Sequence, residues 1–359
     1  MDISKYDGNV HPDEWINDIK KYNSLWENNY GGFLKTVISL IDPTIKLSST
    51  EINDIEKLRN ELKDDISFEV FKNTNKRKLQ SLKYYPERKG GDTSKFISTF
   101  RKLCYNAEIN DIKEQKKYLY KSLPNNHFDY ISNEFYNKMK NVNSINELIK
   151  EFENIVLEES KLIRNESIVA LKHTSTGKYL SSISNLCYTT GSGKQLVFAG
   201  GVEPDPNSLW KIQFDTELAT YADTFIRLQH IKSRNFLGIR YQGYQYDNTK
   251  GRGIYCYYKS PSTKHTEVIC GGEETTWKFN YNKLENYRGY LKSDDIININ
   301  IKRMYDENGR KNGQVEFLRS HDVQFTIGND LFQEVVCHNE RLGGNDEWCI
   351  ELIHEVNIF

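Results

Sequence analysis

The sequence predicts two fold classes in one chain, an all-α domain over residues 1–160 followed by an all-β trefoil over residues 167–355. Before about residue 160, apolar residues fall at helical spacing, and after it they fall in short alternating runs. The second half also contains three imperfect copies of one strand-rich unit. Because a single copy could not bury its own apolar face, we expect the three copies to share one pseudo-threefold core.

The helical half carries recognisable start signals. Pro12 suits the first turn of a helix, and Trp15 and Ile19 then fall on one face. A second start is predicted at Asp92, an acceptable N-cap residue, and a third at Ser144, which forms a capping box with Glu147. These signals predict a bundle of several helices.

The clearest break inside the helical half is Gly90-Gly91. Paired glycines mark a turn because they tolerate conformations that end a helix. We therefore expect possible lobes over residues 1–89 and 90–160.

The three copies in the second half share one order of features. Each has a histidine followed by an aromatic residue, and each closes on a tryptophan that begins an alternating strand. The histidines are His173, His230 and His321, and the tryptophans are Trp210, Trp277 and Trp348. The aromatic residue follows six positions after the first two histidines but four positions after His321. We expect a two-residue deletion in the third turn.

Composition limits the classes of partner. The 359 residues contain 13% aromatic residues, and the net charge is -1. Disordered chains are poor in aromatic residues, so both halves are expected to fold. A chain without strong net charge has no general field that attracts nucleic acid, so no nucleic-acid partner is expected.

The cysteines and the first residues predict a location. The six cysteines show no C-x-x-C pair and no zinc-type spacing with histidine, so neither a metal nor another cofactor is expected. The sequence starts without an apolar signal segment and has no run long enough for a membrane span. We expect a cytoplasmic protein with free thiols and no direct membrane insertion.

The second half resembles the MIR domain, the β-trefoil module of protein O-mannosyltransferases and of inositol-trisphosphate and ryanodine receptors. The resemblance rests on the Leu-x-His pattern of residues 171–180, the strand of residues 191–197 and the closing strand of residues 207–212, and it covers about residues 167–353. It implies a non-catalytic module that binds a ligand or a protein. The transferase and channel parts of those proteins have no counterpart here.

The first half resembles, more weakly, the capsid region of retrotransposon Gag proteins. The similar segments are residues 6–8, 12–16, 96–104 and 118–124. The resemblance implies a two-lobed helical interaction domain that can associate with itself. Because no CCHC zinc knuckle follows, nucleic-acid packaging is not implied.

The repeated histidines and tryptophans have two interpretations each. Three histidines around one axis could bind zinc, but symmetry-related strand ends lie far apart unless they point inward, so we favour a structural role in the repeat for His173, His230 and His321. The tryptophans could stack on a sugar, but their identical placement favours the core for Trp210, Trp277 and Trp348.

Two groups are the candidate ligand-binding residues. The basic residues Lys178, Arg234, Arg240 and Arg252 could hold a phosphate or an anionic glycan, although loop cations are usually only solvated. Tyr244 and Tyr246 belong to a tyrosine-rich insertion, and tyrosine is enriched at interfaces. Alternate tyrosines there could instead face the core.

No catalytic motif is present in the sequence, since it contains neither a G-x-S-x-G elbow nor an H-E-x-x-H pair. We therefore predict a non-enzymatic recognition or adaptor protein. Its trefoil would bind a glycan, an anionic small molecule or a partner protein, and residues 1–160 would mediate docking or self-association. One alternative is a capsid-like self-assembling protein derived from a mobile element. A weaker one is an accessory module of a carbohydrate-active system.

Overall fold

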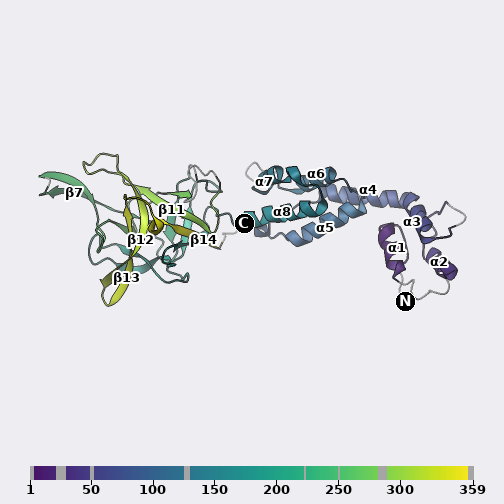
Figure 1. Ribbon diagram of the computed structural model, residues 1–359, viewed down its shortest axis with the longest axis horizontal. Coiled ribbons are helices and arrows are strands. Elements are labelled where there is room, and N and C mark those ends of the chain that lie inside the picture. Colours follow the sequence, from purple (N-terminus) through teal and green to yellow (C-terminus); the bar gives the residue numbers. More distant parts are fainter. Residues whose placement is uncertain are drawn as a thin grey trace. The chain divides into compact units, whose positions relative to one another are not determined.

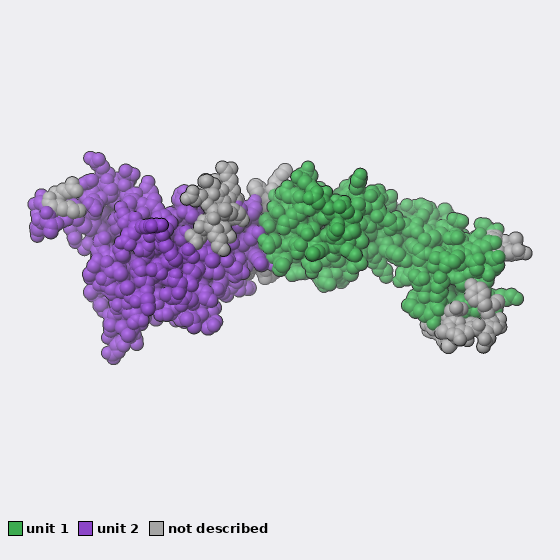
Figure 2. Space-filling view, viewed as in Figure 1, with its two compact units in different colours: residues 1–159 green, residues 160–359 purple. Residues whose placement is uncertain are grey.

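The chain divides into two compact units, Met1–Glu159 and Ser160–Phe359 (Figure 2). The computed structural model describes residues 4–21, 30–48, 52–124, 130–221, 224–249, 251–281 and 289–354. Within these residues the first unit is helical and the second is built of antiparallel strands (Figure 1). The predicted fold class, all-α followed by all-β, is confirmed.

The first unit contains eight α-helices in its described residues. They are α1 (Pro12–Lys20), α2 (Tyr30–Ser39), α3 (Ile55–Asp64), α4 (Ile66–Ser81), α5 (Thr93–Asn106), α6 (Ile112–Ser122), α7 (Tyr130–Lys138) and α8 (Ile145–Ser160). Two short 3₁₀ helices, η2 (Glu87–Lys89) and η3 (Met139–Asn141), lie between them. Every helix in the described part of the chain is too short or too polar to span a membrane.

Side-chain caps fix where several of these helices begin. The carboxylate of Asp92 accepts a hydrogen bond from the Lys95 amide at 2.8 Å, as expected from the sequence. The Ser144 hydroxyl accepts from the Glu147 amide, while the Glu147 carboxylate accepts from the amide of Asn143. In the predicted capping box the Glu147 carboxylate would accept from the amide of Ser144, but here it accepts from the preceding residue, Asn143. At α1 the cap is His11, whose Nδ1 accepts from the Asp13 amide at 3.1 Å.

The helical unit has one apolar core around α1, α2 and α3 and a second group of packed rings beyond it. The first core includes Trp15, Phe33 and Leu58. In the second group the ring of Phe96 lies 5.7 Å from that of Phe152, so α5 packs on α8. Gly90, at φ +79°, ends the η2 turn between α4 and α5, which also contact each other. The lobe boundary at this turn stays a prediction.

The second unit contains fourteen strands in its described residues. They are β1 (Ile168–His173), β2 (Leu180–Cys187), β3 (Gln195–Ala199), β4 (Trp210–Gln213), β5 (Arg227–His230), β6 (Leu237–Ile239), β7 (Tyr241–Asp247), β8 (Arg252–Tyr257), β9 (Thr266–Cys270), β10 (Trp277–Tyr281), β11 (Asp295–Lys302), β12 (Val315–Ile327), β13 (Asp330–His338) and β14 (Trp348–His354), with the 3₁₀ helix η4 (Gly344–Asp346) before the last. Twelve strands form one sheet, and β7 pairs only with β8.

Three tryptophans anchor this unit in the same way. The indole nitrogen Nε1 of Trp210 donates to the carbonyl of Leu180 at 2.9 Å. Trp277 donates to Leu237, and Trp348 to Leu318, each at 3.0 Å. All three indoles are fully buried in one core. The three leucines therefore mark equivalent positions in three repeats.

Strand register gives the same equivalence. Leu180 pairs with Ala199, Leu237 with Cys270 and Leu318 with Cys337. His321 lies three residues beyond Leu318, inside β12, whereas His173 and His230 lie seven residues before their leucines. The structure thus corrects the predicted equivalence of His321 with the other two histidines.

The residue that replaces the third histidine is Ile301, because Trp277 pairs with Ile301 as Trp348 pairs with His173 and Trp210 with His230. The amide of His173 donates to the carbonyl of Lys178, and that of His230 to Asn235. In the third repeat the amide of Arg303 donates to Gln314, across a longer loop. The third turn therefore carries an insertion, where the sequence had predicted a two-residue deletion.

Candidate functional site

His173 and His230 are buried and hold the turns that follow them. Nδ1 of each ring is 2.9 Å from a hydroxyl of its own turn, Thr176 or Ser233. Nε2 of each ring approaches a backbone carbonyl, that of Asn345 for His173 and that of Asn207 for His230. Burial lowers the pKa of both rings below the usual value. With both nitrogens engaged, these rings have no free position for a metal.

His321 has different surroundings. Its ring centroid lies 6.3 Å from that of His265, and its Nε2 is buried without a hydrogen-bond partner. Burial, followed by the nearby Arg319, lowers its pKa. His173, His230 and His321 do not form a metal-binding group among the described residues.

Three of the four candidate cations have described surroundings, and two of those three already have a partner. Lys178 donates to Gln333 Oε1 at 2.7 Å, and Arg240 pairs with Glu273 at 3.2 Å. Arg234 is an exposed turn residue with φ +60°. Arg252 begins β8, and its side chain lies outside the described residues.

The tyrosine-rich insertion folds as the β7–β8 hairpin, which we call the tyrosine hairpin (Figure 1). Its inner rings pack on one another and on the loop after β11. The ring of Tyr241 lies 5.8 Å from that of Tyr255, with nearly parallel planes, and 4.8 Å from that of Tyr305. These contacts make the base of the hairpin a small aromatic cluster, which orders a strand pair that would be marginal alone.

A buried polar contact joins this cluster to the main sheet. The hydroxyl of Tyr257 donates to the carboxylate of Glu274, and the guanidinium of Arg303 lies 4.6 Å from the Tyr257 ring centroid. Burial, with the Glu274 contact, raises the pKa of Tyr257, and burial also raises the pKa of Glu274. The hairpin is therefore held at its base by both aromatic packing and hydrogen bonding.

Tyr244 and Tyr246 project from the outer part of the hairpin, and each is 63% exposed. Because they are two residues apart on one strand, their side chains lie on the same face. The Tyr244 ring covers Gly253 so closely that a Cβ there would lie 1.7 Å from the tyrosine hydroxyl. The backbone of β8 thus supports one ring of an exposed aromatic pair.

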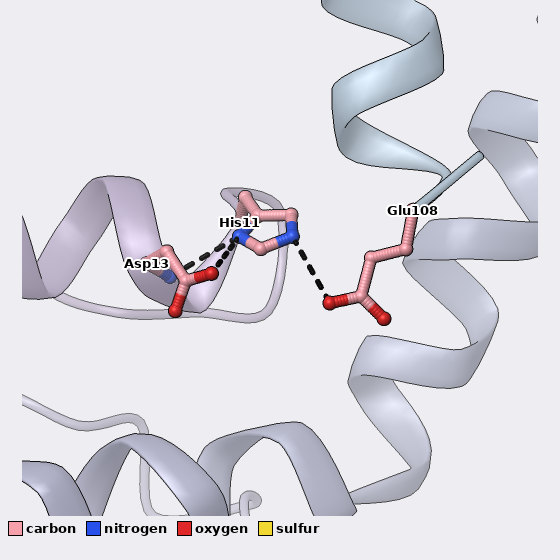
Figure 3. A group of neighbouring side chains, drawn as sticks. All are labelled: His11, Asp13 and Glu108. Atoms are coloured by element: carbon pink, nitrogen blue, oxygen red, sulfur yellow. Dashed lines mark hydrogen bonds and ion pairs between the residues drawn. The ribbon is translucent and has the colours of Figure 1, made fainter. Parts of the chain in front are cut away.

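Among the described residues, one group of histidine and acidic side chains is compact enough to hold a metal ion. It lies in the helical unit and consists of His11, Asp13 and Glu108 (Figure 3). His11 Nε2 lies 3.7 Å from Glu108 Oε1, and the ring packs against Phe68 and Tyr105. Burial lowers the pKa of His11. Sequence reasoning missed this cluster because Glu108 is distant in sequence, although the position of His11 before Pro12 was visible.

A cation of the chain itself already lies between these carboxylates. Lys63 Nζ is 2.9 Å from Asp13 Oδ2 and 3.0 Å from Glu108 Oε1. Arg59 Nε adds a second positive charge 3.2 Å from Asp13 Oδ1. His11 Nδ1 is also used to cap α1. The donor set suits an ion-pair network better than a metal centre, because a metal would have to displace Lys63.

Comparisons with known proteins give no family. No protein-family profile matches the sequence, and neither does any curated protein. The chain is similar to the crystal structure of the SDF2-like protein from Arabidopsis thaliana, with 23% identity and a TM-score of 0.40 over 54% of this chain and 99% of that one.

Two further solved structures are similar at the same level. A Caenorhabditis elegans protein of unknown function shares 19% identity, with a TM-score of 0.40 over 54% of this chain and 98% of that one. The Saccharomyces cerevisiae protein O-mannosyltransferase Pmt1-Pmt2 complex bound to the sugar donor shares 17% identity, with a TM-score of 0.39 over 71% of this chain and 37% of that one. At these scores, none of the three assigns a function.

Proposed function

We propose that this chain is a non-enzymatic recognition protein whose all-β unit is a β-trefoil of the MIR type and binds a ligand through the tyrosine hairpin. The observation that carries the proposal is the exposure of Tyr244 and Tyr246 on one face of a hairpin whose base is packed. Large exposed aromatic side chains on an ordered support are typical of binding surfaces. The three tryptophan anchors support the trefoil interpretation.

The ligand class follows from the chemistry of this face. Arg240 is already paired with the opposite charge of Glu273, and Lys178 donates a hydrogen bond to Gln333. Two tyrosine rings offer apolar faces for stacking and hydroxyls for hydrogen bonds, which suits the mixed surface of an uncharged glycan. We therefore propose a neutral glycan as the ligand, with a partner protein as the competing outcome.

The test is binding of the full-length chain to an array of neutral and acidic glycans. The proposal predicts binding to neutral glycans and a loss of at least about tenfold in the double variant Tyr244→Ala/Tyr246→Ala, as expected when stacked aromatic anchors are truncated. A matched control is Tyr85→Ala/Tyr136→Ala, since both residues are exposed tyrosines of the helical unit. Binding of acidic glycans alone, or equal binding by both double variants, would refute the proposal.

For the helical unit we propose a docking role. The alternative of capsid-like self-assembly stays a prediction that light scattering on the full chain tests. Assemblies that grow with concentration would support self-assembly, and a monomer at every concentration would contradict it.

A further inference from the structure

The helical unit contains a groove of about 730 Å³ between α4, α5 and the loop of residues 7–9. A volume of this size is typical of ligand sites. The groove belongs to neither the tyrosine hairpin nor the His11 cluster, so the proposed function does not account for it.

One wall of the groove is a ridge on α4. Ile66, Val70, Thr74 and Lys78 all line the groove and recur at every fourth position, which places them along one side of the helix. Ile66 is 73% exposed and Val70 is 56% exposed, although the helix buries Phe68 and Leu79 elsewhere. At a rise of about 1.5 Å per residue the ridge is about 18 Å long. Two adjacent large apolar side chains are thus left uncovered beside a hollow.

The opposite wall contains an unsatisfied polar atom. Asn106 is only 7% exposed, yet its side-chain oxygen Oδ1 is buried without a hydrogen-bond partner. Its Nδ2 donates a long hydrogen bond to Asn75 Oδ1 at 3.4 Å. A buried acceptor without a donor is unfavourable, so a ligand that brings an N–H to this oxygen would satisfy it. A backbone amide is such a donor.

One end of the groove is positively charged. Lys78 and Lys102 line it, and both are exposed. Tyr84, just after α4, contacts Phe96 near the start of α5, so the two helices run in opposite directions. Lys78 and Lys102 therefore lie on the same side of the Asn75–Asn106 pair. No ion pair of either ammonium group occurs within the described ranges.

We propose that this groove binds an extended segment of a partner protein that carries apolar side chains and a carboxylate. The apolar side chains cover Ile66 and Val70, a backbone amide donates to Asn106 Oδ1, and the carboxylate pairs with Lys78 and Lys102. At about 3.3 Å per residue, the 18 Å ridge accommodates about five or six residues of an extended chain. The chain is then an adaptor with a peptide site in its helical unit, independent of any glycan site in the other unit.

The test begins with a displayed library of random dodecapeptides, selected on the immobilised full-length chain. The Val70→Lys chain serves for counter-selection, since Val70 is exposed and its replacement leaves the buried face of α4 intact. The proposal predicts enrichment of peptides that combine apolar residues with Asp or Glu. The most enriched peptide is then synthesised with a fluorescent label and titrated by fluorescence anisotropy.

We expect the peptide to bind at least tenfold more weakly to Val70→Lys and to the double variant Lys78→Glu/Lys102→Glu. Leu157→Lys is the matched control, because Leu157 on α8 has the same 56% exposure as Val70, and its binding should be unchanged. A peptide whose carboxylates are replaced by lysines should regain affinity for the charge-reversed variant. Circular dichroism checks that each variant keeps its helices.

Three results would overturn the proposal. The first is that no enriched peptide distinguishes the wild-type chain from Val70→Lys. The second is a basic consensus, which the two lysines could not attract. The third is a dimer of the free chain that Val70→Lys dissociates, since a second copy would then occupy the groove.

Discussion

Glu267 and Glu334 occupy equivalent positions in two repeats, three residues before Cys270 and Cys337, but only Glu334 has both carboxylate oxygens hydrogen-bonded. Glu334 accepts from the amides of Ser262 and Thr263 and from the Thr263 hydroxyl. Glu267 accepts from the amide of Ser192 at 3.1 Å, and its Oε2 is buried without a partner. In both repeats a buried glutamate accepts hydrogen bonds from the hairpin turn of the repeat before it. At Glu267, however, one buried oxygen has no hydrogen bond to offset its loss of contact with water.

We predict that Glu267→Gln stabilises the protein at pH 8. Burial raises the pKa of Glu267 from 4.5 to about 7, so the folded state holds a proton that the unfolded chain has released. This contribution to stability is complete below about pH 4.5 and is lost as the pH rises through 7. A glutamine stays neutral at every pH, so the variant does not lose this stability as the pH rises. The pKa shift of Glu267 corresponds to about 3 kcal/mol in the free energy of unfolding. Calorimetry of the full chain should show no difference at pH 4.5 and a growing gain towards pH 8.

Glu334→Gln is the matched control for this prediction. A glutamine has one acceptor oxygen for the three donors that face Glu334, so this variant should lose about 1–3 kcal/mol at pH 8. If both variants shift the stability in the same direction, the proposed difference in hydrogen bonding between Glu267 and Glu334 is refuted.

The tryptophan anchors predict three equal effects. Trp210→Phe, Trp277→Phe and Trp348→Phe each remove the donor to a leucine carbonyl inside the core, so each should lower the stability of the β unit by about 1–3 kcal/mol. Trp15→Phe is the control in the other unit, because Trp15 donates to the Ser4 carbonyl. Calorimetry should show the first three variants shifting one transition and Trp15→Phe another. A repeat whose tryptophan can be replaced without loss would contradict the equivalence.

Removal of Lys63 should expose a latent metal site. Lys63→Ala leaves Asp13 and Glu108 without their shared ammonium group, and because these groups are partly exposed, we expect a loss of only about 1 kcal/mol. Zinc should then raise the melting temperature of the variant and leave the wild-type protein unchanged. Lys20→Ala, which breaks an exposed pair with Glu56, serves as the control. Equal stabilisation of the wild-type protein by zinc would show that Lys63 does not fill the site.

Thiol reactivity should follow burial. Cys187 is exposed, whereas burial raises the pKa of Cys104 to about 12 and that of Cys270 to about 11. With a disulfide reagent at pH 8, Cys187→Ser should remove the fastest phase of the native protein, and Cys104→Ser should leave that phase unchanged. In denaturant all six cysteines of the wild-type chain should react. A fast phase that persists in Cys187→Ser would contradict the described burial.

The repeats could be predicted from sequence where local chemistry marks them. Trp210, Trp277 and Trp348 each begin a strand after a turn, and this pattern is visible without a structure. The third repeat was placed wrongly because Ile301 stands where the other repeats have histidine, and because His321 offered a local match. Only the pairing of Leu318 with Cys337 and its hydrogen bond from Trp348 show the true register.

The candidate sites were predictable only in part. The tyrosine-rich insertion was visible as composition, but which tyrosines pack and which project depends on the twist and pairing of β7 with β8. The network of His11, Lys63 and Glu108 joins residues far apart in sequence, as does the groove between α4 and α5. No local pattern specifies such contacts, because they depend on how the helices pack.

The most direct test of the recognition proposal is an equilibrium titration of the strongest-binding neutral glycan against the wild-type chain, Tyr244→Phe and Tyr244→Ala. Because stacking uses the ring, Tyr244→Phe should bind within about threefold of wild type, while Tyr244→Ala should lose about 1–2 kcal/mol, or roughly tenfold in affinity. Unchanged affinity in Tyr244→Ala, or the absence of any neutral glycan that binds, would contradict recognition through the tyrosine hairpin.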